Sequence, residues 1–236
     1  MEAAGYTTLT RQSGLMREMQ TVANNIANIS TTGFRREGVI FSEYVRQMEG
    51  DPSLSMARAS GRQIDLSQAG LSQTGGTFDL AIQGDGFFLI ETPQGERLTR
   101  AGSFTPSPEG ELVTMDGNRL LDAGGAPVFV PPGARSVAIG KDGTMSADGT
   151  PVAQIGLWQP TDPNSLRHQS GTLFSASGVE PAQAGVVMQG FLEDSNVEPV
   201  SEVARMIQVQ RSYEMGQKFL EAEDERVRGV IQTLGR

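Results

Sequence analysis

The chain has 236 residues, a formal net charge of −9 and no cysteine. This length allows one or two domains with a sizeable core, whereas the negative charge argues against nucleic acid as a partner, because phosphates require a basic surface. Without cysteine the chain forms neither disulfides nor thiolate metal sites, and no apolar run approaches the roughly 20 residues that a membrane span needs.

The N-terminal segment, residues 5–30, is predicted to be helical. Its apolar residues follow a heptad spacing, and the run ends at Gly33, where glycine can adopt the left-handed conformation that closes a helix. The segment lacks the apolar core of a secretory signal, so we expect any export to proceed without a cleaved signal peptide. The stripe consists of Leu15, Met19, Val22, Ile26 and Ile29.

Three asparagines, Asn24, Asn25 and Asn28, lie near the end of this segment. Asparagine is a poor helix former because its side chain competes for backbone hydrogen bonds. The residues mark either a fraying helix end or amides that form fixed hydrogen bonds across a helix–helix interface, and their spacing favours neither. Asn28-Ile29-Ser30 also matches a glycosylation sequon, which is a weak signal inside a predicted helix.

The middle of the chain is predicted to be a β domain. Residues 34–76 carry weak signals that favour an extended or β-structured connecting arm. Residues 77–194 contain short apolar runs separated by four Asp-Gly pairs, which are strong turn signals. This spacing predicts a compact, mostly antiparallel β domain.

No group of residues in this domain points to catalysis. Gly84-Asp85-Gly86 lacks the third glycine of a dinucleotide loop and the lysine of a P-loop. Asp142 and Asp148 do not have the spacing of a calcium loop, and turn formation explains them better.

The remaining candidates for chemistry also have structural interpretations. His168 has no cysteine or second histidine with which to bind a metal, so we interpret it as a solvated loop histidine. Arg100 is interpreted as an exposed strand residue or a member of a buried ion pair, and Trp158 as a packing residue. We therefore expect no enzyme activity, no metal and no cofactor.

The C-terminal segment, residues 195–236, is predicted to form a long helix that begins near Pro199, since proline suits the first helical turn. Residues 200–234 would span roughly 50 Å. Further apolar residues lie off the main stripe, and a helix that is apolar on two sides needs more than one neighbour. A core helix of one domain is the simpler interpretation, but the length favours burial by other copies. The stripe contains Val203, Met206, Gln210, Tyr213, Gln217, Leu220, Asp224, Val227, Ile231 and Leu234.

These patterns together predict an α+β fold. Residues 1–33 and 195–236 would pair as a coiled-coil-like domain of terminal helices, joined through the 34–76 arm to the β domain at 77–194. As a monomer the helix pair would leave apolar surface in water, so we expect both ends to be poorly ordered until copies assemble.

Several motifs resemble those of the bacterial flagellar rod and hook family. The resemblance implies an axial protein of the flagellar basal body, exported through the flagellum-specific type III apparatus and polymerised as a helical tube. It also implies an inner layer of terminal helices and an outer layer of β domains. The motifs occur in order at residues 23–28, 31–35, 79–88, 99–104, 190–197 and 210–214.

Within this family, the chain length and Leu98 are similar to the proximal rod members, because distal rod and hook members more often carry tyrosine at that position. Val203 departs from the methionine that members often carry. The resemblance thus implies a structural subunit of the proximal rod that transmits torque for motility. A distal rod protein and a soluble binding or adhesin module are the alternatives.

The expected partners are further copies, other rod proteins and the flagellar export apparatus, with no nucleic acid and no membrane insertion. The predicted location is the periplasmic rod of the basal body. The helices would form the assembly interface, with the asparagines setting its register. The predicted interface residues are Leu15, Met19, Val22, Asn24, Asn25, Ile26, Asn28, Val203, Met206, Gln210, Tyr213, Gln217 and Leu220.

Overall fold

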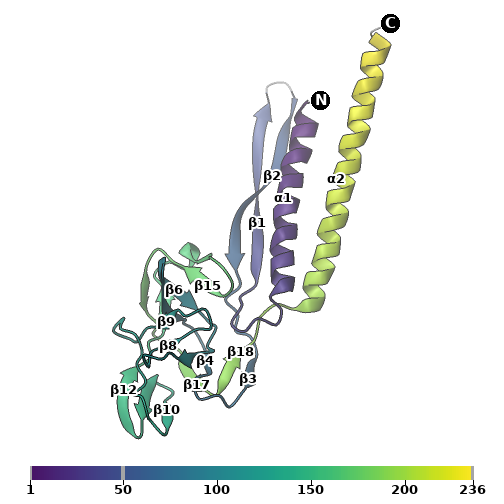
Figure 1. The fold of residues 1–236 in the computed structure, drawn as a ribbon. Helices are drawn as coiled ribbons and strands as arrows, with labels where there is room; N and C mark the ends of the chain where they lie inside the picture. The colour runs from purple at the N-terminus through teal and green to yellow at the C-terminus, as the bar shows by residue number, and fades with distance from the viewer. Residues whose placement is uncertain (1, 49–50, 235–236) are drawn as a thin grey trace. The chain divides into compact units, whose positions relative to one another are not determined.

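The computed structural model describes residues 2–48 and 51–234 and has the predicted α+β class (Figure 1). The chain divides into two compact units. The helical unit contains Met1–Ala27, Glu37–Gln63 and Glu198–Arg236, and the β unit contains Asn28–Arg36 and Ile64–Val197. Segments from both ends of the sequence therefore meet in one unit, as the paired heptad stripes predict.

The helical unit consists of two helices and a long β hairpin. Helix α1 spans Glu2–Ala27 and helix α2 spans Pro199–Leu234, which is 36 residues, or about 54 Å. Strands β1 (Glu37–Met48) and β2 (Asp51–Ile64) form a two-stranded sheet. In Figure 1, α1 lies between this hairpin and α2, so α1 is covered on two sides.

Helix α1 ends at Ala27, three residues before the predicted end. The backbone N–H of Thr31 donates to the carbonyl of Asn28 at 3.2 Å, which closes a turn in place of a further helical turn. Gly33 has a φ of 72°, the left-handed conformation expected of it. Its role is to redirect the chain after this turn.

The β unit is built from short strands. Its largest sheet has seven strands in the order β14-β15-β6-β5-β9-β8-β7, and β10, β11 and β12 form a three-stranded sheet. Two-stranded pairs β13-β16, β17-β4 and β18-β3 complete it, and all of its registered pairings are antiparallel. The elements are β3 Leu71–Gln73, β4 Leu80–Gln83, β5 Phe88–Thr92, β6 Gly95–Thr99, β7 Thr105–Pro106, β8 Leu112–Val113, β9 Arg119–Leu120, β10 Val137–Ile139, β11 Thr144–Ala147, β12 Thr150–Gln154, β13 Trp158–Pro160, the 3₁₀ turn η1 Pro163–Ser165, β14 Arg167–His168, β15 Leu173–Ser175, β16 Val179–Pro181, β17 Val186–Gln189 and β18 Phe191–Glu193.

Three of the four Asp-Gly pairs lie at turns, as predicted, and Asp85-Gly86 lies in a bend between β4 and β5. Between β11 and β12, Asp148 and Gly149 have φ values of 50° and 82°, and positive φ at both central residues is typical of a type I′ hairpin turn. The Asp148 carboxylate also accepts hydrogen bonds from the backbone N–H groups of Ser136 and Arg135, which lower its pKa below the ordinary value. Asp148 therefore holds two segments together.

The β unit includes residues outside the segment predicted as the β domain. Strand β3 pairs with β18, and the backbone N–H of Gly33 donates to the carbonyl of Glu193 at 2.7 Å. Residues 28–36 and 64–76 thus join the body formed by residues 77–194. Two apolar clusters fill this body, one around Phe88 and Leu112 and the other around Leu98 and Phe174.

Candidate assembly interface

An antiparallel seam joins α1 and α2. The side chains buried along it include Leu15 and Val22 from α1, exposed by 9% and 4%, and Val209 from α2, exposed by 2%. Polar contacts set the register, since Gln12 Nε2 donates to the Tyr213 carbonyl at 3.1 Å. Further along, Arg205 Nε donates to Glu18 Oε1 at 2.6 Å in an ion pair.

The seam on α2 is offset by one residue, at alternate positions, from the predicted stripe. The predicted stripe and the observed seam share every second residue. At the positions between, the seam uses the residue one place earlier in the chain, so the polar residues of the predicted stripe do not face α1. Three predicted members lie at least partly buried on the seam, namely Met206, Tyr213 and Leu220. The other three are exposed, namely Val203, Gln210 and Gln217, and the seam uses Glu202, Val209 and Gly216 in their place. The expectation that polar Gln210 and Gln217 are seam positions of the helix pair is therefore wrong.

The Gln12 side chain of α1 lies directly against Gly216 of α2. A Cβ on Gly216 would lie 2.6 Å from Gln12 Nε2, so a larger residue at this position requires the flexible end of the Gln12 side chain to move. A glycine inside a helix is otherwise unfavourable by roughly 1 kcal/mol relative to alanine. The other glycine of this helix, Gly229, has open space around it, so the contact with Gln12 distinguishes Gly216.

Asn25 connects all three elements of the helical unit. Its side chain is fully buried, and Nδ2 donates to the Glu37 carbonyl at 2.8 Å and to Glu202 Oε2 at 3.1 Å. In return, the Glu37 backbone N–H donates to Asn25 Oδ1 at 3.0 Å. Asn25 therefore forms fixed hydrogen bonds across a helix–helix contact, whereas Asn28 accepts a hydrogen bond from the Thr31 hydroxyl in the turn after the helix.

The other predicted interface residues of α1 are half-buried. They are Met19, Asn24 and Ile26. Their position beside the seam leaves part of each side chain accessible. Whether these residues and the exposed members of α2 contact other copies remains a prediction.

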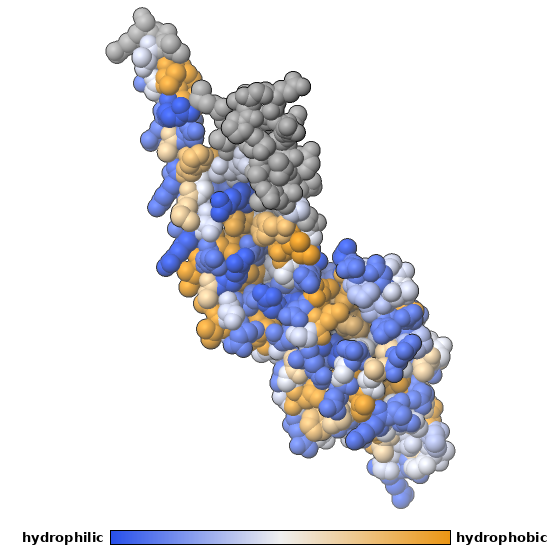
Figure 2. Space-filling view, turned by 180° about the vertical axis from the view of Figure 1, so that it is seen from behind, coloured by the Kyte–Doolittle hydropathy of each residue, from blue (hydrophilic) through white to orange (hydrophobic). Residues whose placement is uncertain are grey.

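Both helices carry exposed apolar side chains away from the seam, and Figure 2 shows apolar side chains interrupting the polar surface of the helical unit. These residues lie on more than one side of α2, as predicted for a helix that needs several neighbours. On α1 they are Leu9 and Met16, and on α2 they are Val200, Val203, Ile207, Met215, Phe219, Val227, Val230 and Ile231.

A groove of about 380 Å³ runs along one side of the helix pair. Leu15 and Gly216 lie among its lining residues, together with Met215 and Phe219 of α2 and Arg11 of α1. Its lining is mostly apolar, and the groove contains no cluster of acids or histidines that would indicate chemistry. It is a surface feature suited to packing.

In the β unit, a buried ion cluster joins residues that are distant in the sequence. Glu193 Oε1 accepts from Arg35 Nη2 at 2.8 Å and from the Ala69 backbone N–H at 3.0 Å, while its Oε2 accepts from Arg100 Nη1 at 3.1 Å. All three charged side chains are at most 4% exposed. Of the two interpretations of Arg100, the buried ion pair is the correct one. Its partner Glu193 has no local sequence signal.

The groups around Arg100 hold its side chain in place within the β unit. Burial lowers the pKa of Arg100 below its ordinary value, and the charge of Glu193 opposes that shift. Its second nitrogen, Nη2, donates to the Gly84 carbonyl at 2.8 Å, and the guanidinium lies 5.3 Å from the centre of the Phe87 ring. These contacts hold the loop at Gly84-Asp85-Gly86 in place.

His168 is not the solvated loop residue that was expected. Its ring packs edge-to-face against Phe34 and Phe174, with centroids 5.4 Å and 5.0 Å away. Trp158 is half-buried against the apolar cluster that contains Phe174, in agreement with a packing role. In the part of the chain that the structure describes, no three acidic or histidine side chains gather in a manner suited to a metal. Neither helix, over its described residues, is apolar enough to cross a membrane.

Three family profiles match the chain in order. A profile described as flagella basal body rod protein matches residues 6–35, and one described as flagellar hook protein FlgE/F/G D1 domain matches residues 81–147. A third, flagellar basal body rod FlgEFG protein C-terminal, matches residues 188–233. The first and third cover most of the helix pair and the second covers much of the β unit.

Full-length relatives carry related names. The chain is 37% identical to the flagellar basal-body rod protein FlgF of Caulobacter vibrioides, over all of this chain and 99% of the relative. It is 37% identical to FlgF of Mesorhizobium japonicum with the same coverage. It is also 32% identical to the flagellar basal-body rod protein FlgG of Bacillus subtilis, over 97% of this chain and 96% of that protein.

Proposed function

Because this chain belongs to the flagellar basal-body rod protein family and hence to the basal body of the bacterial flagellum, we propose that it forms part of the proximal rod. Its terminal helices pack with those of neighbouring subunits, and the resulting tube transmits torque. The subunit acts mechanically and uses no cofactor. Its partners are further copies and other rod proteins, and the flagellar export apparatus delivers it.

The observation that carries this proposal is the apolar surface left on α2 outside its own seam. Val200 is 76% exposed, and Met215 and Ile231 are each 64% exposed. Large apolar side chains along several sides of one helix indicate a contact surface for other proteins. A tube of parallel subunits provides such neighbours along the whole helix.

The assignment to the proximal part of the rod is supported by sequence similarity. The FlgF relatives are 35–37% identical over their full lengths, compared with 30–32% for the FlgG relatives. Leu98, which is fully buried in β6, is the position that favoured the same assignment in the sequence. The distal rod remains the alternative position.

Charging the seam tests this function. Met206→Glu or Leu220→Glu, expressed in a strain from which the chromosomal copy has been deleted, is expected to abolish incorporation into basal bodies and swimming. The buried or half-buried carboxylate opposes helix packing, whereas the melting temperature of the β unit should not change. Ser201→Glu is the matched control, because it introduces the same charge at an exposed position in the first turn of α2. A deletion strain that swims normally would overturn the proposed function.

A further inference from the structure

The chain passes between its two units at four places, one of which is the turn after α1. At the other three crossings, regular elements begin or end almost at the boundary of the β unit. Strand β1 begins directly after Arg36, β2 ends at Ile64, and α2 begins at Pro199, two residues after Val197. Glu198 is therefore the one residue at these three crossings that belongs neither to the β unit nor to a regular element.

The side chain of Asn196 joins the three crossing segments within the β unit. Its Oδ1 accepts from the Arg36 backbone N–H at 2.6 Å, and its Nδ2 donates to the carbonyls of Asp65 and Ser67, each at 3.0 Å. The Asn196 backbone N–H also donates to the Phe34 carbonyl at 3.3 Å. We call Asn196, Arg36, Asp65 and Ser67 the junction clamp.

The first two segments of the junction clamp are also bonded to each other. The Asp65 backbone N–H donates to the Arg36 carbonyl at 2.8 Å, and Arg35 Nη1 donates to the Ser67 carbonyl at 2.7 Å. Arg35 belongs to the buried ion cluster as well, so the clamp is attached to the interior of the β unit. Asn196 adds the third segment to this pair.

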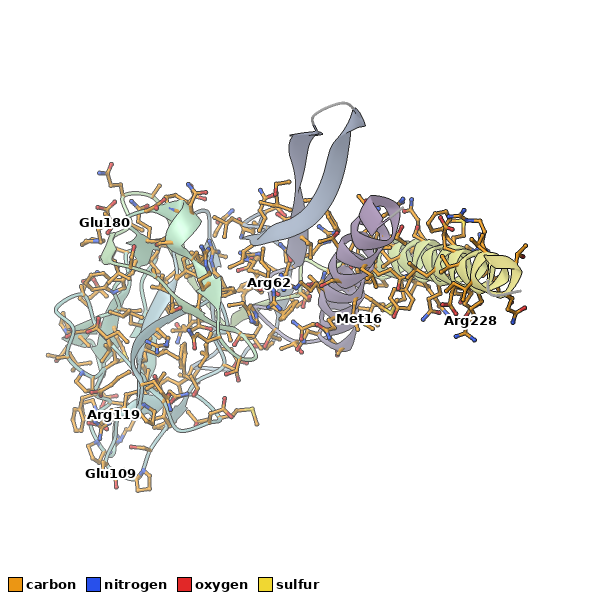
Figure 3. The ribbon with its side chains drawn as sticks, turned by 90° about the horizontal axis from the view of Figure 1, so that it is seen from above. Met16, Arg62, Glu109, Arg119, Glu180 and Arg228 are labelled. Carbon is orange, nitrogen blue, oxygen red and sulfur yellow. The ribbon has the colours of Figure 1, made fainter. Side chains whose placement is uncertain are left out.

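A second set of contacts holds the same elements within the helical unit. Glu37, the residue after Arg36, forms two backbone hydrogen bonds with the Asn25 side chain, which also donates to Glu202 of α2. The Glu37 Oε2 atom lies 3.5 Å from Nη1 of Arg62 in β2, which is labelled in Figure 3. Each unit therefore holds its own ends of the β1, β2 and α2 crossings in place.

This arrangement affects how rotation passes along the chain. A single peptide crossing transmits rotation poorly, because each residue has two backbone dihedral angles that turn easily. Hinges between domains use loop residues or the ends of elements to absorb such changes. Here the crossings contain almost no loop, and their ends are bonded to one another, so turning one segment against the others would break the hydrogen bonds of Asn196.

We propose that Asn196 is the positioning residue of this junction and that it stiffens the connection between the helical unit and the β unit against rotation. The inference rests on the proposed function, since a subunit built from two units carries torque only when both units turn together. Asn196 lies in the β unit, outside both terminal helices. Its role therefore concerns the inside of one subunit and not the contact between copies.

Hydrogen exchange of the purified full-length chain tests the clamp itself. Asn196→Ala removes the acceptor of the Arg36 N–H, and this amide should exchange about tenfold faster, while the amides of β5 and β6 keep their rates. Asn196→Asp keeps an acceptor for the Arg36 N–H but cannot donate to the carbonyls of Asp65 and Ser67. The Arg36 amide should therefore stay protected in Asn196→Asp.

Two results of this exchange measurement would overturn the proposal. One is an unchanged rate at Arg36 in Asn196→Ala, which would mean that the clamp does not hold this segment. The other is an equal acceleration throughout the β unit, which would make Asn196 a general packing residue.

Single-molecule energy transfer in isolated basal bodies tests the stiffness. Because the native chain has no cysteine, Glu109→Cys and Ser201→Cys place one dye on an exposed turn of the β unit and one on the first turn of α2. Expression with an excess of unlabelled native chain ensures that both dyes of a pair lie in one subunit. Adding Asn196→Ala should leave incorporation unchanged and broaden the distribution of transfer efficiencies.

Asn118→Ala is the matched control, because it removes the same amide from a half-buried position in a turn of the β unit. It should change neither the exchange rate at Arg36 nor the transfer distribution. A distribution as narrow in Asn196→Ala as in the parent would overturn the proposal. Loss of incorporation would also overturn it, since the junction clamp lies outside the assembling helices.

A strain from which the chromosomal copy has been deleted separates this proposal from the proposed function. If this strain does not swim while Asn196→Ala gives a narrow distribution, the junction proposal fails and the rod function stands. If the deletion strain swims normally, the rod function fails, and the junction proposal fails with it.

Discussion

Asn25 and Glu202 are 177 positions apart, yet the Asn25 amide nitrogen donates to a Glu202 carboxylate oxygen at 3.1 Å inside the helical unit. The same nitrogen donates to the backbone carbonyl of Glu37. One buried amide thereby connects α1, α2 and the start of the β1–β2 hairpin. A side chain that makes directed contacts with three elements specifies their relative register.

We expect Asn25→Ala to destabilise the helical unit by roughly 2–4 kcal/mol, because it removes three buried hydrogen bonds, one of them to a carboxylate. Denaturant unfolding of assembled rods that contain the variant measures the change, because the terminal helices are expected to be fully ordered only in the assembly. Asn24→Ala is the adjacent control at a half-buried position and should have a smaller effect. Equal losses in the two variants would contradict the assignment of register to Asn25.

Removing the charge of Glu193 should be more damaging. Glu193→Gln leaves the buried guanidinium groups of Arg35 and Arg100 without a counter-charge, and breaking a buried pair in this way typically costs roughly 3–5 kcal/mol. The melting temperature of the β unit is the measurement. Glu91→Gln removes an exposed pairing with Arg119 and should leave that temperature near the wild-type value. A similar small shift in both variants would show that the buried cluster contributes little.

A Cβ at Gly33 has no space. Gly33 and Gly75 have nearly the same positive φ, 72° and 73°, but a Cβ on Gly33 would overlap the backbone of Arg100 and Ala101, whereas Gly75 has open space around it. Gly75→Ala should cost about 1 kcal/mol from backbone strain alone. Gly33→Ala should cost more than about 3 kcal/mol. Chemical denaturation measures the loss in free energy of unfolding for both variants, and the difference between the two losses is the cost of the steric overlap at Gly33. Equal losses would contradict the overlap.

Asp65 should make the β unit sensitive to acid. Partial burial tends to raise its pKa, but hydrogen bonds from Ser67 and the charges of Arg36 and Arg35 outweigh burial and hold the pKa below its ordinary value. A lowered folded-state pKa stabilises the protein above the ordinary value of about 3.9 and loses this effect as the pH falls through the lowered value.

Asp65→Asn should therefore reduce stability at neutral pH, and the difference from wild type should shrink below about pH 4. Denaturant unfolding across a pH series measures it. Asp116→Asn removes the same charge from an exposed turn and is the matched control. A difference between Asp65→Asn and wild type that stays constant with pH would contradict the electrostatic explanation.

The terminal helices of an isolated chain should be less protected than the β unit. Limited proteolysis of dilute monomer is expected to trim both ends, because the apolar stripes lack neighbours, and to leave a resistant fragment. The sequence analysis predicts a β domain at 77–194, whereas the β unit in the structure contains residues 28–36 and 64–197. Mass spectrometry of the fragment decides between these bounds. Rigid, fully protected ends in the lone chain would contradict the expectation.

Features with a local signal could be predicted from the sequence. The heptad stripes, the Asp-Gly turns and the left-handed Gly33 depend on spacing or on a single backbone conformation, and the α+β class follows from them. The ordered motifs also sufficed to identify the family. The choice between two neighbouring stripes on α2 was harder to predict from the sequence, because Met206, Tyr213 and Leu220 belong to both stripes.

The contacts that distinguish the two stripes on α2 are tertiary contacts with α1. Val209 is buried on the seam and the Gln12 side chain lies against Gly216, and these contacts are visible only when both helices are in place. The ion cluster was missed for a related reason. Arg35 and Glu193 are 158 positions apart, and no periodicity links two charges so distant. The prediction for His168 is wrong because its aromatic neighbours are distant in the sequence: Phe34 lies in the loop after α1 and Phe174 lies in β15.

The long separation of Arg35 from Glu193 also bears on the order of folding. A chain delivered through a narrow channel, one end first, cannot complete the β unit while either residue is still inside. Nearly the whole chain must emerge before the carboxylate meets its guanidinium groups, since contacts so remote in sequence form late. Under the proposed export, closure of the β unit inside the channel would thereby be avoided, and the subunit would reach its final form after delivery.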